Sequence, residues 1–155
     1  MHYFHVVFTL PAELRAVAKR SRQRVFDILF ASAAETLAAL ARDPKRLGAE
    51  LGVTMVLHTW TRELLFHPHV HAIVTGGGLT ADGTRWLRAR RKFLFPVRVM
   101  GALFRGKMLD ALERAHAHGL VDLEGIDLQA LHRKSWIVYA KRPFGGPEQV
   151  IRYLG

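Results

Sequence analysis

The sequence predicts an α+β fold, a split β-α-β (ferredoxin-like) antiparallel sheet with helices on one face and the other face open. Short apolar stretches that alternate with period two are separated by two long stretches in which apolar residues recur every three or four positions. The order of these stretches is β-α-β-β-α-β-α. Hydrophobic residues make up 50% of the 155 residues, so we expect a single domain over residues 1–155 with a substantial core.

The first strand and the first helix are the clearest elements. Residues 3–8 alternate between apolar positions of one side and mixed positions of the other, which is typical of a strand. Apolar residues then recur at helical spacing over residues 12–42. We expect this helix to be kinked near Ser21 and to end at Asp43-Pro44, because the residue before a proline disfavours helical angles.

Two further strands and a small hairpin follow. Residues 53–60 and 69–75 are predicted strands, and the triplet Gly76-Gly77-Gly78 is expected to close the second of them. A smaller hairpin is predicted between Trp86-Leu87 and Phe93-Leu94-Phe95.

The second half of the chain repeats the helix-then-strand order. A helix is predicted from Pro96 to Gly119, since proline suits a helix start and glycine suits its end. Residues 118–127 are rich in Gly and Asp and are predicted to be a loop. A last strand over 136–141 then leads through a turn to a helix that begins at Glu148.

The charge balance points to a polyanionic partner. The chain carries 23 Lys and Arg against 13 acids, a formal net charge of +10, and no acid occurs between Arg85 and Lys107. A solvated basic surface is the alternative interpretation. The candidate DNA-binding residues are Arg85, Arg88, Arg90, Arg91, Lys92, Arg98, Lys141, Arg142 and Arg152.

Two absences narrow the possibilities further. The chain has no cysteine, which excludes disulfides, thiolate zinc sites and a cysteine nucleophile. The N-terminus opens directly into a strand pattern and no stretch approaches 18 uninterrupted apolar residues. We therefore expect a cytoplasmic protein that makes no contact with a membrane.

The segment His67-Pro68-His69-Val70-His71 carries the strongest chemical signal. Residues two apart in a strand point to the same face, so His69 and His71 are expected to project side by side. Two neutral imidazoles in this arrangement can chelate a divalent ion. The alternative is a polar sheet face that binds no metal.

A catalytic metal site normally has three protein ligands, so a third ligand is needed. His67 joins the same row if the extended geometry continues through Pro68. His58 and His5 lie opposite the apolar side of their own strands and are expected to share the open face. Gln149 lies four residues before Tyr153, so their side chains share one stripe of the last helix.

Three separate blocks of this chain resemble a known family. They are residues 67–78 with the His-x-His pattern, residues 3–11 (Tyr-Phe-His-Val-Val-Phe-Thr-Leu-Pro), and residues 143–150 followed by Tyr153-Leu154-Gly155. In collinear order they resemble the rolling-circle insertion-sequence transposases. These are two-tyrosine members of the HUH endonucleases, which are named for a His-hydrophobic-His metal motif.

The resemblance implies a function and a site. It implies a DNA transposase core that binds Mg or Mn at His69 and His71, with Tyr153 as nucleophile. Such a core nicks and rejoins single-stranded DNA at transposon ends through a covalent 5′-phosphotyrosine, in the bacterial cytoplasm and in association with the nucleoid. The family has a second tyrosine four residues after the first and an N-terminal cysteine-rich zinc module. This chain has neither, so we expect a catalytic-core fragment that is truncated at the C-terminus and lacks the zinc module.

Two other functions fit parts of the pattern. The first is a non-catalytic module that binds single-stranded nucleic acid on the open sheet face. The second is a metallohydrolase of small substrates, although no Asp or Glu closely follows His71 to complete such a site. A covalent protein–DNA product distinguishes the transposase from both.

Overall fold

The computed structural model describes residues 1–90, 92, 94–145, 148, 149 and 152, with the backbone alone for 142–145. The elements of this described part are, in chain order, β1 (His2–Thr9), η1 (Ala12–Leu14), α1 (Arg15–Arg20), α2 (Arg22–Arg42), β2 (Glu50–Trp60), β3 (Phe66–Leu79), β4 (Trp86–Arg88), α3 (Val97–Ala117), α4 (Leu128–Arg133) and β5 (Val138–Gly145).

The strands form one sheet in the order β2-β3-β1-β5, and β4 pairs with the far end of β3. Every pairing is antiparallel, so β1 and β2 run parallel to each other with β3 between them. This is the split β-α-β topology, with α1 and α2 as the crossover between the two parallel strands. The predicted fold class is confirmed.

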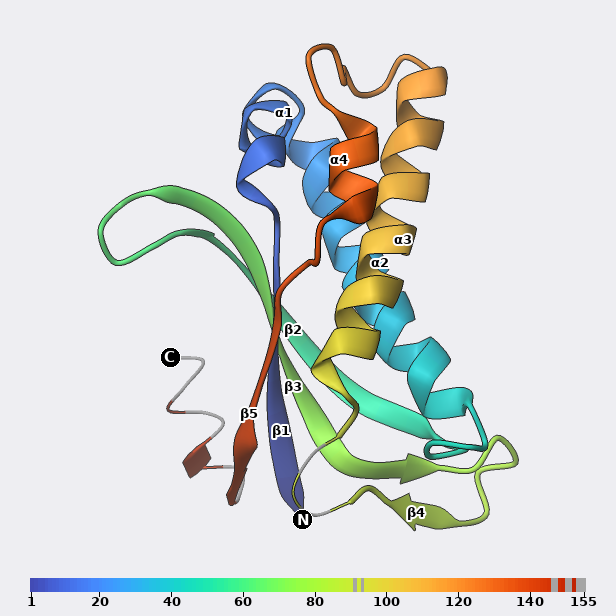
Figure 1. Cartoon of the computed structure of the whole chain (residues 1–155). Coiled ribbons are helices and arrows are strands. Elements are labelled where there is room, and N and C mark those ends of the chain that lie inside the picture. Colours follow the sequence, from blue (N-terminus) through green and yellow to red (C-terminus); the bar gives the residue numbers. More distant parts are fainter. Residues whose placement is uncertain (91, 93, 146–147, 150–151, 153–155) are drawn as a thin grey trace.

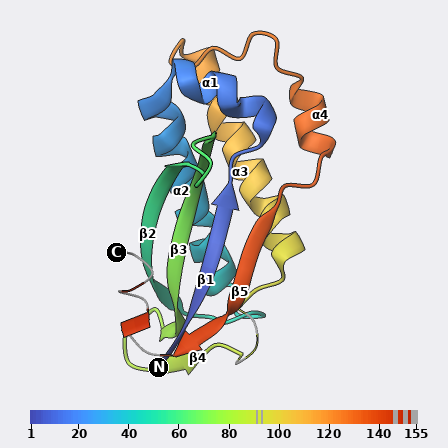
Figure 2. The same cartoon turned by 90° about the vertical axis from the view of Figure 1, so that its left-hand side faces the viewer.

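The helices α2 and α3 lie against one face of the sheet, and no helix among residues 1–90 and 94–145 lies against the opposite, open face (Figures 1 and 2). The inward side chains of β1, among them Phe4, Val6 and Phe8, are buried in the core between these layers. The rings of Phe8 and Phe104 of α3 have centroids 5.0 Å apart. Burial of each such side chain contributes about 1.5–3 kcal/mol, so this face supplies most of the folding energy.

The first helix is broken where the sequence predicted a kink. Ser21 lies between α1 and α2 with φ −129° and ψ 53°, outside helical angles, while its N–H still donates to the Val17 carbonyl at 3.0 Å. The second part, α2, ends at Arg42, and the extended backbone of Asp43 precedes Pro44 as expected.

The prediction that the Gly76–Gly78 triplet closes the third strand is wrong, because β3 continues through it to Leu79. The triplet is a place of close backbone approach. A Cβ at Gly78 would collide with the Glu50 carbonyl of β2, and one at Gly77 with the Leu87 carbonyl of β4. Glycine therefore allows β3 to be bordered closely by both neighbours.

The small hairpin is formed by other partners than predicted. The strand β4 pairs with β3, opposite Gly77–Leu79, whereas Leu94 and Phe95 are buried core residues outside any strand and Phe93 lies outside the described residues. The last strand was predicted two residues too early, since it begins at Val138. Trp136 is instead buried, and its indole N–H donates to the Leu131 carbonyl at 3.1 Å.

The helix α4 was not predicted from the sequence. Its N-cap is Asp127, whose carboxylate accepts a hydrogen bond from the Ala130 N–H at 2.9 Å. Leu131 is its buried residue.

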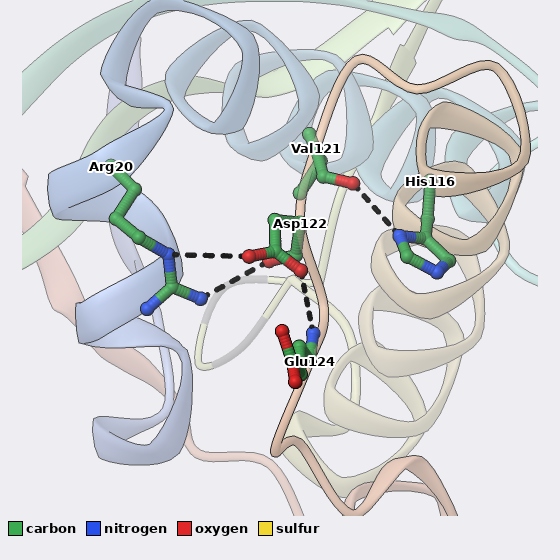
Figure 3. Close-up of polar contacts among 5 residues, drawn as sticks. All are labelled: Arg20, His116, Val121, Asp122 and Glu124. Atoms are coloured by element: carbon green, nitrogen blue, oxygen red, sulfur yellow. Dashed lines mark hydrogen bonds and ion pairs between the residues drawn. The ribbon is translucent and has the colours of Figure 1, made fainter.

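The predicted loop that precedes α4 is fixed to two helices (Figure 3). Arg20 of α1 donates to the Asp122 carbonyl at 3.3 Å, and Nδ1 of His116 lies 2.9 Å from the Val121 carbonyl. Within the loop, the Glu124 N–H donates to the Asp122 carboxylate at 2.8 Å. None of the helices in the described part of the chain has the length and apolar character needed to cross a membrane.

Candidate metal centre

Three histidines from two neighbouring strands come together on the open face of the sheet. His69 of β3 is paired directly with His58 of β2, so their side chains emerge on the same side. His71 lies two residues further along β3, and strand alternation places it on that side too. The strand parity expected from the sequence for these three residues matches their placement.

The distances in this group suit a shared ligand. Each ring offers one nitrogen, and the three nitrogens lie within 4.8 Å of one another. The ring centroids of His58 and His71 are 4.3 Å apart, and those of His69 and His71 are 4.8 Å apart. Imidazole nitrogens bind a metal ion at about 2 Å, so three nitrogens this close together could hold one cation.

Hydrogen bonds determine which nitrogen of the two β3 histidines is available. Nδ1 of His69 lies 2.6 Å from the His67 carbonyl, and a carbonyl only accepts, so Nδ1 of His69 carries a proton and donates. The lone pair of the neutral His69 ring is then on Nε2. Nδ1 of His71 is 2.8 Å from Nε2 of His5, which leaves Nε2 of His71 as its candidate ligand atom.

The site favours uncharged imidazoles, the form that binds metals. Burial, followed by the neighbouring histidines and Lys141, lowers the pKa of His71 to about 4. Burial and then His69 lower the pKa of His58 as well. These rings are therefore ready to ligate without first losing a proton at neutral pH.

His67 lies beside this group but does not belong to it. The Arg15 guanidinium donates a hydrogen bond to Nδ1 of His67 at 2.6 Å. A neutral His67 then has its proton on Nε2 and no lone pair left for a cation. The structure thus gives a physical reason to prefer His58 over His67 as third ligand.

Of the two C-terminal candidates, Gln149 and Tyr153, the structure describes only Gln149. Gln149 is exposed and lies in a helical stretch with Glu148. Tyr153, the candidate nucleophile, lies outside the described residues.

His5 of β1 lies next to His71 on the same face of the sheet, outside the group of three histidines. Its side chain is 1% exposed and its ring is nearly parallel to that of His71, with centroids 5.1 Å apart and an interplanar angle of 13°. Burial, and then Lys141, lower the pKa of His5 to about 4. The sequence indicated His5 as a candidate ligand, and the structure places it outside the group of three, within hydrogen-bond distance of His71.

The candidate DNA-binding residues are not all near the histidines. Lys141 lies on β5 directly opposite His5 and is exposed near the histidines. Arg88 belongs to β4 and pairs with Gly77, six residues along β3 from His71, which is about 20 Å. Also exposed are Arg85, Arg90, Lys92, Arg98 and Arg152, whereas Arg91 and the side chain of Arg142 lie outside the described residues.

Tyr139 is a residue of this face that the sequence reasoning missed. It lies on β5 opposite Val7, which in turn lies opposite His71, so two strand spacings of about 10 Å separate Tyr139 from His71. Its side chain is 60% exposed. The signal was present in the alternation of Val138, Tyr139 and Ala140, where the outer residues face the core and the middle one faces away.

An antiparallel split β-α-β sheet with clustered histidines on its open face is the arrangement expected of the HUH endonucleases. A family model described as "Putative transposase" (Y2_Tnp) matches residues 52–155, and the chain belongs to this family. The resemblance to the rolling-circle insertion-sequence transposases is confirmed.

Two relatives are similar in sequence. The chain is 46% identical over 165 residues to "Putative transposase y4qJ" of Sinorhizobium fredii (strain NBRC 101917 / NGR234), covering 99% of this chain and 42% of that protein. It is 44% identical over 79 residues to the transposase for insertion sequence element IS801 of Pseudomonas savastanoi pv. phaseolicola, covering 51% of this chain and 18% of that protein. The chain thus spans less than half the length of these relatives.

Two solved structures share the fold. One is TrwC in complex with a 27-mer DNA that comprises the recognition hairpin and the cleavage site, with a TM-score of 0.55, 18% identity and coverage of 82% of this chain and 52% of that chain. The other is the conjugative relaxase TrwC with a mutant OriT DNA, with a TM-score of 0.52, 15% identity and coverage of 95% and 69%. At this identity the likeness concerns the fold alone.

Proposed function

We propose that this chain is the nuclease core of a DNA transposase that cuts and rejoins single-stranded DNA with a divalent cation at His58, His69 and His71. The observation that carries the proposal is the convergence of these three imidazoles on the face of the sheet opposite α2 and α3. Membership of a transposase family supports DNA as the substrate. The shared fold of TrwC, which was solved with DNA comprising a cleavage site, supports the same substrate.

The donor set restricts the choice of cation. Imidazole nitrogens suit first-row transition ions, whereas Mg²⁺ prefers oxygen ligands and gives up its water reluctantly. A site of three imidazoles therefore fits Mn²⁺ better than Mg²⁺. When bound, such an ion polarises a non-bridging phosphate oxygen and orients the scissile bond.

Tyr153 is the proposed nucleophile. Its phenol gives up its proton to solvent and the oxygen attacks the phosphorus. The bond from phosphorus to the 3′ oxygen breaks, and that oxygen takes up a proton from solvent and leaves as a 3′ hydroxyl, so the number of bound protons is unchanged. The phosphate remains on the tyrosine as a 5′-phosphotyrosine. A later 3′ hydroxyl reverses these steps and rejoins the strand, with no other source of energy.

A series of tyrosine variants tests the nucleophile. The chain contains three tyrosines, Tyr3, Tyr139 and Tyr153, and each is changed to phenylalanine. We expect a covalent adduct with a single-stranded oligonucleotide on a denaturing gel for the unchanged chain, Tyr3→Phe and Tyr139→Phe. Tyr153→Phe should give no adduct and retain binding. Loss of the adduct in Tyr139→Phe alone would assign the attack to the strand residue instead.

A second series tests the metal. The unchanged chain should form the adduct only when Mn²⁺ is present. The double variant His69→Ala with His71→Ala should form no adduct, with or without Mn²⁺. His132→Ala is the matched control, since His132 pairs with Glu113 on the helical side of the molecule. Oligonucleotide binding without any adduct in the unchanged chain would instead indicate a non-catalytic binding module.

A further inference from the structure

His5 and His71 are diagonal neighbours on the open face of the sheet. His71 lies opposite Val7 and His5 lies opposite Ile73, so the two histidines are offset by two residues on adjacent strands. Such positions are about 7–8 Å apart, a distance that two aromatic side chains bridge. Nε2 of His5 and Nδ1 of His71 are 2.8 Å apart, and His5 is almost fully buried at 1% exposure.

This hydrogen bond has two possible proton positions with opposite consequences. If the proton is on Nδ1 of His71, the neutral ring of His71 has its lone pair on Nε2 and can bind a cation. If the proton is on Nε2 of His5, Nδ1 of His71 accepts and Nε2 of His71 carries the remaining proton. That second form of His71 cannot ligate. His69 has no such alternative, since its Nδ1 faces a carbonyl.

We propose that His5 is a positioning residue of the metal centre: its Nε2 accepts a hydrogen bond from Nδ1–H of His71 and keeps the Nε2 lone pair of His71 available to the cation. His5 itself does not touch the ion. This inference rests on the proposed function, because it gives His71 the role of a ligand. Ligating histidines generally donate their second ring N–H to a fixed acceptor, which orients the ring and makes it more basic.

The surroundings of His5 agree with an acceptor role. The two rings are nearly parallel, with an interplanar angle of 13°, so the line between Nε2 of His5 and Nδ1 of His71 can lie in the plane of both rings, as an N–H···N hydrogen bond requires. Lys141 lies opposite His5 on β5, and its positive charge disfavours a second positive charge on His5. A neutral imidazole can offer a lone pair at Nε2, whereas a charged one only donates.

Three substitutions separate hydrogen bonding from packing. His5→Gln keeps an acceptor at the reach of Nε2, His5→Asn keeps an acceptor too short to reach, and His5→Leu fills the space without one. Binding of Mn²⁺ alone to the whole chain is measured by calorimetry. We expect His5→Gln to stay within about threefold of the unchanged chain and the other two to bind about 10–100-fold more weakly. If His5→Leu fails to fold, the comparison of Gln with Asn decides.

Thr36→Val provides a control for the loss of a buried hydrogen bond. The Thr36 hydroxyl is fully buried in α2 and donates to the Ser32 carbonyl at 2.7 Å, away from the histidines. This variant should keep the full affinity for Mn²⁺. An affinity in His5→Leu within threefold of the unchanged chain would overturn the role of His5.

The tautomer of His71 is measured separately in the metal-free chain by long-range ¹H–¹⁵N correlation spectroscopy. We expect protonated Nδ1 and unprotonated Nε2 in the unchanged chain and in His5→Gln, and a mixture in His5→Leu. A proton on Nε2 of His71 in the unchanged chain would overturn the inference. Failure of the unchanged chain to bind Mn²⁺ would overturn the proposed metal centre itself, which is a different result.

Discussion

The two faces of the sheet follow different rules. On the face covered by α2 and α3, the inward residues of β1 and β3 are apolar and buried, as at Phe8 and Val70. On the other face the same strands carry His5, His69 and His71. Packing explains the first set completely. It does not explain why three imidazoles lie together on the face opposite these helices.

The difference indicates which residues are present for folding and which for chemistry. A neutral imidazole that is partly buried loses hydration without gaining the packing of an aliphatic side chain. His71 illustrates this, because its exposed fraction is 9% and its pKa is lowered to about 4. Side chains that lower stability where they stand are expected at functional sites.

The largest effect expected is on the covered face. Phe8→Ala removes a fully buried ring that packs on Phe104 and should lower the free energy of unfolding by about 3–5 kcal/mol. His58→Ala, on the exposed histidine of the other face, should change it by less than about 0.5 kcal/mol. Urea denaturation measures both. Equal losses of unfolding free energy in the two variants would show that both faces contribute equally to stability, against this account.

Acid should reveal the cost of burying the open-face histidines. The pKa values of His5 and His71 are lowered to about 4 from an ordinary value near 6.5, so between these pH values the unfolded chain binds more protons than the folded chain. The stability that depends on neutral His5 and His71 is therefore fully present above pH 6.5 and is lost as the pH falls toward 4. Because His5 and His71 share one hydrogen bond, we count one proton for the two rings. The free energy of unfolding of the metal-free protein should then fall by about 3 kcal/mol.

The double variant His5→Gln with His71→Gln serves as the comparison for this acid effect. Its free energy of unfolding should vary much less over the same pH range, because neither glutamine takes up a proton. An unchanged pH profile in the double variant would assign the acid sensitivity to other residues.

A smaller effect is expected for an aromatic residue of the open face. Tyr139 is 60% exposed and makes little contribution to the core. Stacking of an unpaired base on an aromatic ring contributes about 1–3 kcal/mol, so Tyr139→Ala should weaken single-stranded DNA binding by roughly tenfold or more. Tyr139→Phe keeps the ring and should keep the affinity, and a loss in both variants would show that stacking is not the cause.

The smallest effect is expected for one charge near the histidines. Lys141→Ala should lower the slope of log affinity against log salt by about 0.7, the value for one phosphate contact on a single strand. Lys107→Ala is a control, since Lys107 of α3 pairs with Glu35 of α2 on the helical side of the molecule. A slope unchanged by Lys141→Ala would separate the DNA path from the face that carries the histidines.

Much of the architecture could be predicted because it depends on local periodicity. The period-two pattern of β1 and β3 predicted which side chains face the helices, and Ser21 was correctly expected to interrupt the first helix. The short helix α4 was missed because six residues carry little periodic signal. It depends on the local Asp127 cap and on the burial of Leu131, and the burial belongs to the tertiary structure.

The candidate site could be predicted only in part for a similar reason. Strand parity placed His69 and His71 on one face, but the choice among the other candidates depended on contacts between distant segments. His58 joins them because β2 pairs with β3 in the register that sets it opposite His69. Arg15, 52 residues earlier in the chain, occupies Nδ1 of His67. The attack by Tyr153 stays a prediction.

The most direct test of the metal centre is the anomalous signal of Mn²⁺ in crystals of this chain. The proposed metal centre predicts one peak on the open face, about 2 Å from Nε2 of His69 and Nε2 of His71. A ring nitrogen of His58 should be the third ligand. The peak should disappear in His69→Ala. A peak elsewhere, or none at a Mn²⁺ concentration that supports DNA cleavage, would contradict it.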